Sequence, residues 1–203
     1  MQGGDYMAIA KKLENNYGNF ITRKELIAEN INNKSFEALI KHNILKRSST
    51  SVYYFNEDYR TIDLEEVNKF EDKSILSFYS AIYYHNLSTH IPKNWDISIV
   101  NNKRPLERAK NRNLRYHYSK PEFFELGLLE VKQNRNLIRI YDLERTVCDV
   151  IKNKKKIDSF VYGETIRNYF NNESKNIKNL KEYSRKLKIE DKVQVYLEVL
   201  YGY

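Results

Sequence analysis

Residues 22–55 combine helix, turn and strand signals in an order that limits the folds open to this chain. Thr22 and Glu25 have the spacing of a capping box, which predicts a helix beginning at Arg23. The turn-tolerant run at 30–33 follows, and a second helix is predicted over about 33–42. Residues 44–47 and 52–55 can then pair as strands around a turn at 48–51. This order predicts a winged helix-turn-helix, which is a DNA-reading module.

The second predicted helix has a buried stripe and a polar face. Phe36, Leu39 and Ile40 recur three and four residues apart, so they should pack inward. Asn side chains can read adenine, and Lys side chains can read guanine or hold phosphate. The candidate DNA-binding residues of the helix and the wing are Asn32, Asn33, Lys34, Ser35, Lys41, Lys46, Arg47, Ser49, Thr50 and Tyr53. The alternative is a small helical subdomain that binds another protein or nothing.

Composition places the chain among folded proteins with an anionic partner. Its 203 residues leave room for two small domains, and 41% hydrophobic residues suffice for a packed core. The net charge of +8 favours nucleic acid. The single cysteine, Cys148, excludes an internal disulfide, and no Cys/His spacing predicts a zinc site. The sequence shows neither a leader pattern nor an apolar run near about 18 residues, so we expect a cytoplasmic protein with no membrane partner.

The positive charge is unevenly distributed along the chain. Residues 20–55 carry six basic and three acidic side chains, 56–72 carry two and seven, and 93–120 carry eight and two. The basic excess therefore lies mainly outside the predicted DNA reader. We hypothesise that a basic cluster contacts DNA phosphates beside the winged helix, although a solvated face or RNA binding would also fit. The cluster comprises Lys103, Arg104, Arg108, Lys110, Arg112 and Arg115.

The predicted organisation is a DNA-binding domain over 1–58, an acidic connecting segment over 59–73 and a second domain over 74–203. Apolar periodicity predicts a helix from Ser74 to about His85 and strands over 95–100, 114–118, 128–132 and 137–141. Asp142 and Asp158 then precede helices, and two more helices follow. The predicted fold class is α+β, with a small antiparallel sheet and a helical C-terminus in the second domain.

An ordered set of short motifs resembles the AbiEi antitoxins of type IV toxin–antitoxin, or abortive-infection, systems. The segment IYDLERTVCDVI at 140–151 is similar to that family's signature. FITRKEL at 20–26, HNILKR at 42–47, SFYSAIYYHNLS at 77–88, ID at 157–158 and YLEVL at 196–200 also fit. No motif is as specific as a metal-ligand signature, but together the motifs span nearly the whole chain.

The resemblance implies a winged helix followed by an antitoxin domain. It further implies a repressor that binds inverted repeats in the double-stranded promoter DNA of its own operon. Such a protein counteracts a nucleotidyltransferase toxin, generally without forming a stable complex with it. Asp142, Arg145 and Asp149 would lie in the signature helix of the antitoxin domain. A structural role for them is the main expectation, with Asp142 as an N-cap and Arg145–Asp149 as an i,i+4 pair.

Two other functions are compatible with the sequence. One is a winged-helix regulator whose second domain binds a ligand or a partner protein. The other is a metal-dependent nuclease, because Glu130 and Lys132 form an E-x-K triplet and Asp96 lies upstream on a predicted strand. E-x-K triplets are common by chance in a Lys-rich chain, so the second alternative is weak. We expect no enzymatic activity, no catalytic residue, no cofactor and no bound metal.

Overall fold

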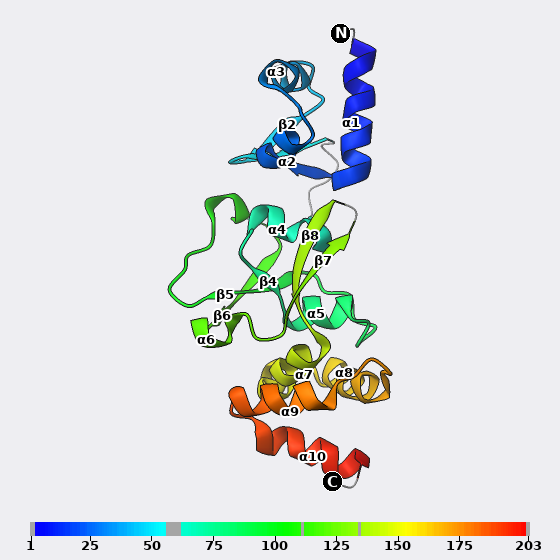
Figure 1. Ribbon diagram of the computed structural model, residues 1–203, viewed down its shortest axis with the longest axis vertical. Helices are drawn as coiled ribbons and strands as arrows, with labels where there is room; N and C mark the ends of the chain where they lie inside the picture. Colours follow the sequence, from blue (N-terminus) through cyan, green and yellow to red (C-terminus); the bar gives the residue numbers. More distant parts are fainter. Residues whose placement is uncertain (1–2, 56–61, 111, 134, 202–203) are drawn as a thin grey trace. The chain divides into compact units, whose positions relative to one another are not determined.

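A computed structural model describes residues 3–55, 62–110, 112–133 and 135–201 of an α+β protein (Figure 1). The chain divides into two compact units. The first unit comprises Met1–Lys73, Arg104–Asn113 and Val131–Ile138, and the second comprises Ser74–Lys103, Leu114–Glu130 and Arg139–Tyr203. Residues 56–61, where the predicted first domain ends and the predicted connecting segment begins, lie outside the described residues.

The first unit opens with helices that flank a three-stranded antiparallel sheet. The sheet has the order β1-β3-β2, with Ile21 and Arg47 both in register with Tyr53. A bulge separates Arg47 from Ser49 in β2. The elements are α1 (Gly3–Tyr17), β1 (Phe20–Thr22), α2 (Arg23–Ala28), α3 (Asn33–Lys41), β2 (Lys46–Ser49) and β3 (Val52–Tyr54).

One hydrophobic core joins these elements. Leu13 of α1, Leu26 of α2 and Leu39 of α3 are all buried in it. Tyr53 of the hairpin lies at its edge. Helices and hairpin therefore form one packed body, because each buries its apolar side against the same cluster.

The acidic segment is folded rather than extended over its described residues. A 3-10 turn, η1 (Leu64–Glu66), leads into a short helix, α4 (Val67–Phe70). Val67 and Phe70 are fully buried, as their helical spacing predicts, and the Phe70 ring lies 5.1 Å from that of Phe20. The segment thus packs against the first unit's own sheet.

A mixed five-stranded sheet has the order β6-β5-β4-β8-β7, and all of it belongs to the second unit except the parts of β7 and β8 within Val131–Ile138, which belong to the first. The prediction of an antiparallel sheet is wrong in two places, because β4 pairs with β8 and β5 pairs with β6 in parallel. A parallel pair needs a long crossover connection, which a pattern of apolar residues does not reveal. The strands are β4 (Ile75–Leu76), β5 (Trp95–Val100), β6 (Leu114–Ser119), β7 (Leu128–Gln133) and β8 (Asn136–Tyr141).

The predicted helix from Ser74 is also wrong at its start. Ile75 and Leu76 form the central strand β4, and the helix α5 (Phe78–Tyr84) begins only after Ser77. Both strand residues are fully buried, so tertiary pairing with β5 and β8 overrides the local helical pattern.

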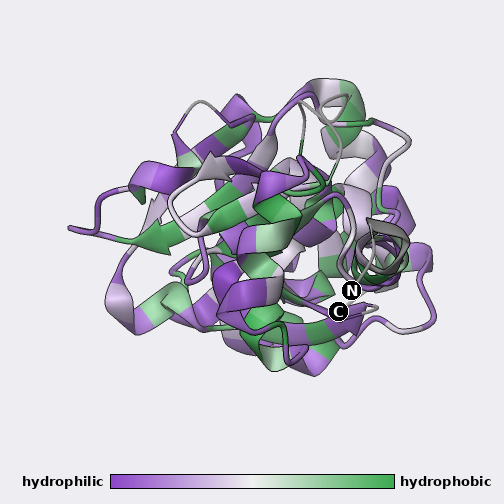
Figure 2. Cartoon of the chain, turned by 90° about the horizontal axis from the view of Figure 1, so that it is seen from above, coloured by the Kyte–Doolittle hydropathy of each residue, from purple (hydrophilic) through white to green (hydrophobic). Residues whose placement is uncertain are grey.

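Helices complete the second unit and enclose its largest core. Helix α7 contacts α5, α8, α9 and α10, and these elements lie close together in Figure 1. Figure 2 shows both green and purple residues along the helices, as expected for elements that bury one side. The other helical elements of the second unit are α6 (Pro121–Phe124), α7 (Leu143–Lys152), α8 (Ser159–Asn171), α9 (Ile177–Lys186) and α10 (Glu190–Tyr201), with the 3-10 turn η3 (Lys154–Lys156). Another 3-10 turn, η2 (Glu107–Ala109), belongs to the first unit.

Among the described residues, the helices are all too short or too polar to span a lipid bilayer.

Candidate nucleic-acid interface

Helix α2 is fixed at both of its ends. At its start, Thr22 Oγ1 accepts from the Glu25 backbone N–H at 3.2 Å, and Glu25 Oε2 accepts from the Thr22 N–H at 2.7 Å. These two bonds form the predicted capping box. At its end, Asn30 adopts a φ of 60°, and the Ile31 N–H donates to the Leu26 carbonyl. That closure turns the chain tightly toward α3.

The polar residues at the start of α3 are exposed to solvent, and their side chains also make hydrogen bonds within the protein. Asn32 is the N-cap, since its Oδ1 accepts from the Ser35 N–H at 2.8 Å. Asn33 Oδ1 accepts from the guanidinium of Arg23, which also lies 4.4 Å from the Phe36 ring centroid. This contact could not be predicted from the sequence, in which Arg23 was expected only to begin a helix, because no local spacing links positions 23 and 33.

The two faces of α3 separate as the spacing predicts. Leu39 is fully buried, and Phe36 and Ile40 pack against the same core. Lys34 and Lys41 are exposed on the other face. The exposed face therefore offers two ammonium groups and the Asn33 side chain to a partner.

The hairpin after α3 places its candidate residues in different environments. Arg47 and Thr50 are exposed, whereas the Tyr53 ring packs edge-on against Phe36 at 5.2 Å. The predicted turn at 48–51 is too long, because β2 continues through Ser49 and the chain reverses at Thr50 and Ser51. Lys46 is half-buried. Arg47 and Thr50 are thus the candidates best exposed for contact with a partner.

Part of the predicted basic cluster belongs to the first unit. Arg104–Asn113 lies on the crossover between β5 and β6, yet it packs with the residues before Ser74. Arg112 donates to Ser48 of β2, and its guanidinium lies 4.7 Å from the Phe70 ring centroid. Burial lowers the pKa of Arg112. This arginine therefore braces the hairpin.

The other members of the basic cluster are not equivalent. Arg108 donates to the Phe70 carbonyl at 3.0 Å and pairs with Asp72, and Lys110 pairs with Glu107 at 2.7 Å. Arg115 belongs to the second unit, where it pairs with Asp96. Lys103 and Arg104 are exposed, and the described part of the chain places no carboxylate within 4.0 Å of either. The structure therefore does not present the six cations as one open surface.

A buried ion cluster ties the acidic segment to β1. The Lys69 ammonium donates to the Tyr17 and Phe20 carbonyls, and Glu66 Oε1 accepts from the Phe20 N–H at 3.1 Å. Burial lowers the pKa of Lys69 and raises the pKa of Glu66. Glu66, one of the acidic residues of the acidic segment, is therefore buried in an internal cluster and is not exposed to a partner.

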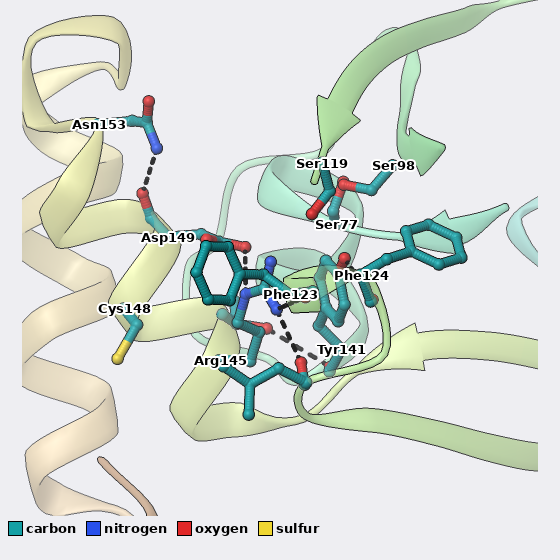
Figure 3. A network of polar contacts seen from close by, with 12 residues as sticks. Ser77, Ser98, Ser119, Phe123, Phe124, Tyr141, Arg145, Cys148, Asp149 and Asn153 are labelled. Atoms are coloured by element: carbon teal, nitrogen blue, oxygen red, sulfur yellow. Dashed lines mark hydrogen bonds and ion pairs between the residues drawn. The ribbon is translucent and has the colours of Figure 1, made fainter. Parts of the chain in front are cut away.

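The signature helix α7 is built around Arg145, as Figure 3 shows. Its Nε donates to Asp149 Oδ2 at 3.1 Å, and its Nη1 donates to the Phe123 and Leu126 carbonyls at 2.6 and 2.8 Å. The guanidinium lies 4.1 Å from the Tyr141 ring centroid. Asp142 Oδ1 caps the helix by accepting from the Arg145 N–H at 2.7 Å. These are the cap and the i,i+4 pair that the structural expectation specified.

The surroundings of this network are closely packed. Arg145 is only 4% exposed, and burial raises the pKa of Asp142, of Asp149 and, to about 12, of the Tyr141 hydroxyl. Gly127 has a φ of +75°, and a Cβ there would lie 2.6 Å from the Arg145 Cβ. The three signature residues thus hold the sheet to the helices and leave little surface for a ligand.

The residues of the nuclease alternative do not form one site. Asp96 lies on β5 and Glu130 on β7, three strand spacings apart, which is about 14 Å. Asp96 is paired with His117 at 2.5 Å, and Glu130 accepts from Arg139 at 3.2 Å. Lys132 is exposed. Two carboxylates so far apart cannot bind one metal ion together.

The cysteine and the metal-ligating side chains of the described residues do not form a nucleophilic or metal-binding site either. Cys148 is fully buried, and burial raises the pKa of its thiol, which disfavours the nucleophilic thiolate. Within the ranges that the structure describes, no group of three His, Cys, Asp or Glu residues could hold a metal ion.

No family model matches the sequence, and no curated protein matches it either.

Proposed function

We propose that the chain binds double-stranded DNA through α2, α3 and the β2–β3 hairpin, acting as a winged helix-turn-helix. The observation that carries the proposal is the order and packing of these elements. Helix α3 presents Asn33, Lys34 and Lys41 outward while its apolar stripe packs on the core that also holds the hairpin. Its nine residues span about 13 Å, a length that fits the major groove.

The proposed contacts divide between base reading and phosphate binding. Asn33 and Lys34 lie in the first turn of α3, the part of a recognition helix that reaches base edges. Arg47 and Thr50 of the hairpin would contact the backbone or the minor groove. Arg104, which belongs to the first unit, would hold a phosphate, while Arg112 keeps the hairpin in place. The phosphate contacts would set affinity and salt dependence rather than sequence preference.

The proposed biological role is that of an antitoxin and autorepressor of the AbiEi type. The support for this role is the resemblance of the 140–151 segment and the other short motifs. In that role the chain would bind inverted repeats in its own promoter and counteract a nucleotidyltransferase toxin without a stable complex. A gene for such an enzyme beside the gene for this chain, whose toxicity the chain relieves on co-expression, would support the role. Co-expression without relief would contradict it.

DNA binding itself is tested with the full chain and the DNA upstream of its gene. Replacing Lys34 by Ala should weaken binding to that DNA by about tenfold, since a direct base contact contributes about 1–3 kcal/mol. Lys178→Ala, an exposed lysine of α9 in the second unit, is the control with the same loss of charge. Fluorescence anisotropy on specific and scrambled duplexes would measure both. Equal affinities of Lys34→Ala and Lys178→Ala would contradict the assignment of α3.

A further inference from the structure

A cavity of about 520 Å³ lies in the helical part of the second unit. It is bordered by the end of α7, the turn η3, α8 and α10. All of its lining residues belong to the second unit. It shares no residue with the proposed DNA interface, and it shares one residue, Asn153, with the network of Figure 3, where Asn153 donates to the Asp149 carbonyl at 2.9 Å.

Positive charge converges on this cavity from three elements. Lys152 comes from the last turn of α7, three consecutive lysines form η3, and Lys192 comes from the first turns of α10. The cationic lining residues are Lys152, Lys154, Lys155, Lys156 and Lys192. All five are exposed, and within the described chain no carboxylate oxygen lies within 4.0 Å of their ammonium groups.

The floor of the cavity is apolar and partly aromatic. Ile151, Val195 and the rings of Tyr162 and Tyr196 line it. The two tyrosine hydroxyls hydrogen-bond to each other, and the Lys154 ammonium lies 5.0 Å from the Tyr162 ring centroid. An apolar hollow of this kind, ringed by five ammonium groups, suits a molecule with a flat ring and several negative charges.

An ordinary solvated lysine face explains this arrangement less well. A cation in the last turn of a helix complements the helix dipole, which accounts for Lys152 alone. No acidic side chain is among the described residues that line the hollow, so five like charges lie around it and a bound anion would reduce the repulsion between them. Lys192 is far from the run at 152–156 in sequence and reaches the same hollow through the packing of α10 on α7.

We propose that this cavity binds a nucleotide, free or within a single strand of RNA. The lysines would hold the phosphates, and the base would lie on the apolar floor. Such a combination of cations and aromatic rings is how proteins bind single-stranded nucleic acid without reading its sequence. The inference does not depend on DNA binding by the first unit.

The experiment measures binding of the full chain to ATP, to inorganic tripolyphosphate and to a short single-stranded RNA by calorimetry. ATP or the RNA should bind more tightly than tripolyphosphate, because only they can use the apolar floor. The triple variant Lys154→Ala/Lys155→Ala/Lys192→Ala should weaken that binding by about tenfold or more. Lys120→Ala/Lys132→Ala/Lys178→Ala removes three exposed lysines outside the cavity and is the matched control.

A second pair of variants tests the floor without removing a lysine. Val195→Asp places a negative charge in the hollow and should weaken binding, whereas Val199→Asp, four residues later on α10 and outside the cavity lining, should not. Both positions are exposed, at 56% and 78%, so both variants should fold.

ATP binding would identify a free nucleotide as a ligand, and binding of RNA alone would identify a single strand of RNA as the ligand. Equal affinity for tripolyphosphate, unchanged binding by the triple variant, or binding only to vesicles of anionic lipid would overturn the proposal.

Discussion

Arg145 shows how one side chain can join three parts of a fold. Its guanidinium satisfies two backbone carbonyls of the α6 region, pairs with Asp149 and lies over Tyr141. Because a buried charge is costly unless all of its partners are present, the group is stable only as a set. The segment 140–151 therefore specifies a packing arrangement in this chain.

Replacing Arg145 by Met should destabilise the second unit strongly. The change leaves the Asp149 carboxylate buried without its cation, a loss of about 3–5 kcal/mol in the free energy of unfolding. Chemical denaturation followed by circular dichroism measures it. Arg185→Met, at a side chain that is 62% exposed, should change stability little. Similar losses of unfolding free energy in both variants would show that Arg145 stabilises the second unit no more than an exposed arginine does.

His85 makes the stability of the second unit sensitive to mild acid. Its Nε2 bonds the Tyr141 carbonyl at 2.7 Å, and burial lowers the pKa of the imidazole below its ordinary value of 6.5. The unfolded chain then binds a proton near pH 6.5 that the folded chain takes up only at lower pH. This histidine's contribution to stability is therefore fully present above pH 6.5 and decreases as the pH falls from 6.5 toward the lower pKa of the folded state.

The expected result is a smaller acid effect when the histidine is removed. Between pH 7.5 and 5.5, wild type should lose more unfolding free energy than His85→Gln, whose side chain can still donate to the carbonyl. Urea denaturation at several pH values gives the comparison. Parallel pH curves for the two proteins would exclude a role for His85.

At the scale of elements, the crossover between β5 and β6 does two different jobs. Arg112 packs on Phe20 and Phe70 and donates to Ser48, whereas Arg104 is exposed. The two arginines belong to one basic run in the sequence, but only one of them is open to a partner. Their substitutions should therefore have separable effects.

Arg112→Ala should lower the free energy of unfolding of the first unit by roughly 1–2 kcal/mol through lost contact with the two rings. Arg104→Ala should leave stability unchanged and reduce the slope of log affinity against log salt by about 1, as expected for one lost phosphate contact. Thermal denaturation and a salt titration of DNA binding measure the two effects. If the slope of log affinity against log salt in Arg104→Ala equals that of wild type, this arginine does not contact a phosphate.

Elements with local start signals could be predicted from the sequence. Thr22, Asp142 and Asp158 each cap the helix that was expected after them, because a capping hydrogen bond needs only residues two or three positions away. The strand at 95–100 was likewise predicted with its observed bounds. Such features depend on neighbours in the chain.

Elements set by distant partners could not be predicted. Ile75 and Leu76 form a strand only because β5 and β8 lie on either side of them. The packing of Arg112 against Phe70, and of Lys192 beside η3, likewise joins residues far apart in the chain. The candidate DNA-binding residues near α3 could be proposed from the sequence because they lie close together in the chain, and their role stays a prediction. The lysine-lined cavity was missed because its fifth lysine comes from another helix.

At the scale of the whole molecule, the chain leaves its first unit and returns to it twice. Lys73 ends the first passage, Arg104–Asn113 forms the second, and Val131–Ile138 forms the third. In the third, the Asn136 side-chain amide donates to the Tyr17 carbonyl at 3.2 Å, and Arg135 pairs with Glu29 of the first. The first unit is therefore continuous in space and divided in sequence.

This division has a consequence for how the gene could have arisen and for how it can be dissected. A fragment ending at residue 73 would lack the segments Arg104–Asn113 and Val131–Ile138, which belong to the same unit. Truncation at that point therefore does not give a complete folded unit. End-to-end fusion of one gene for each unit would place each unit in a single continuous stretch, which is not the arrangement of this chain. The chain crosses between the two units at five boundaries, so replacing one unit by its counterpart from another protein would require five matched junctions.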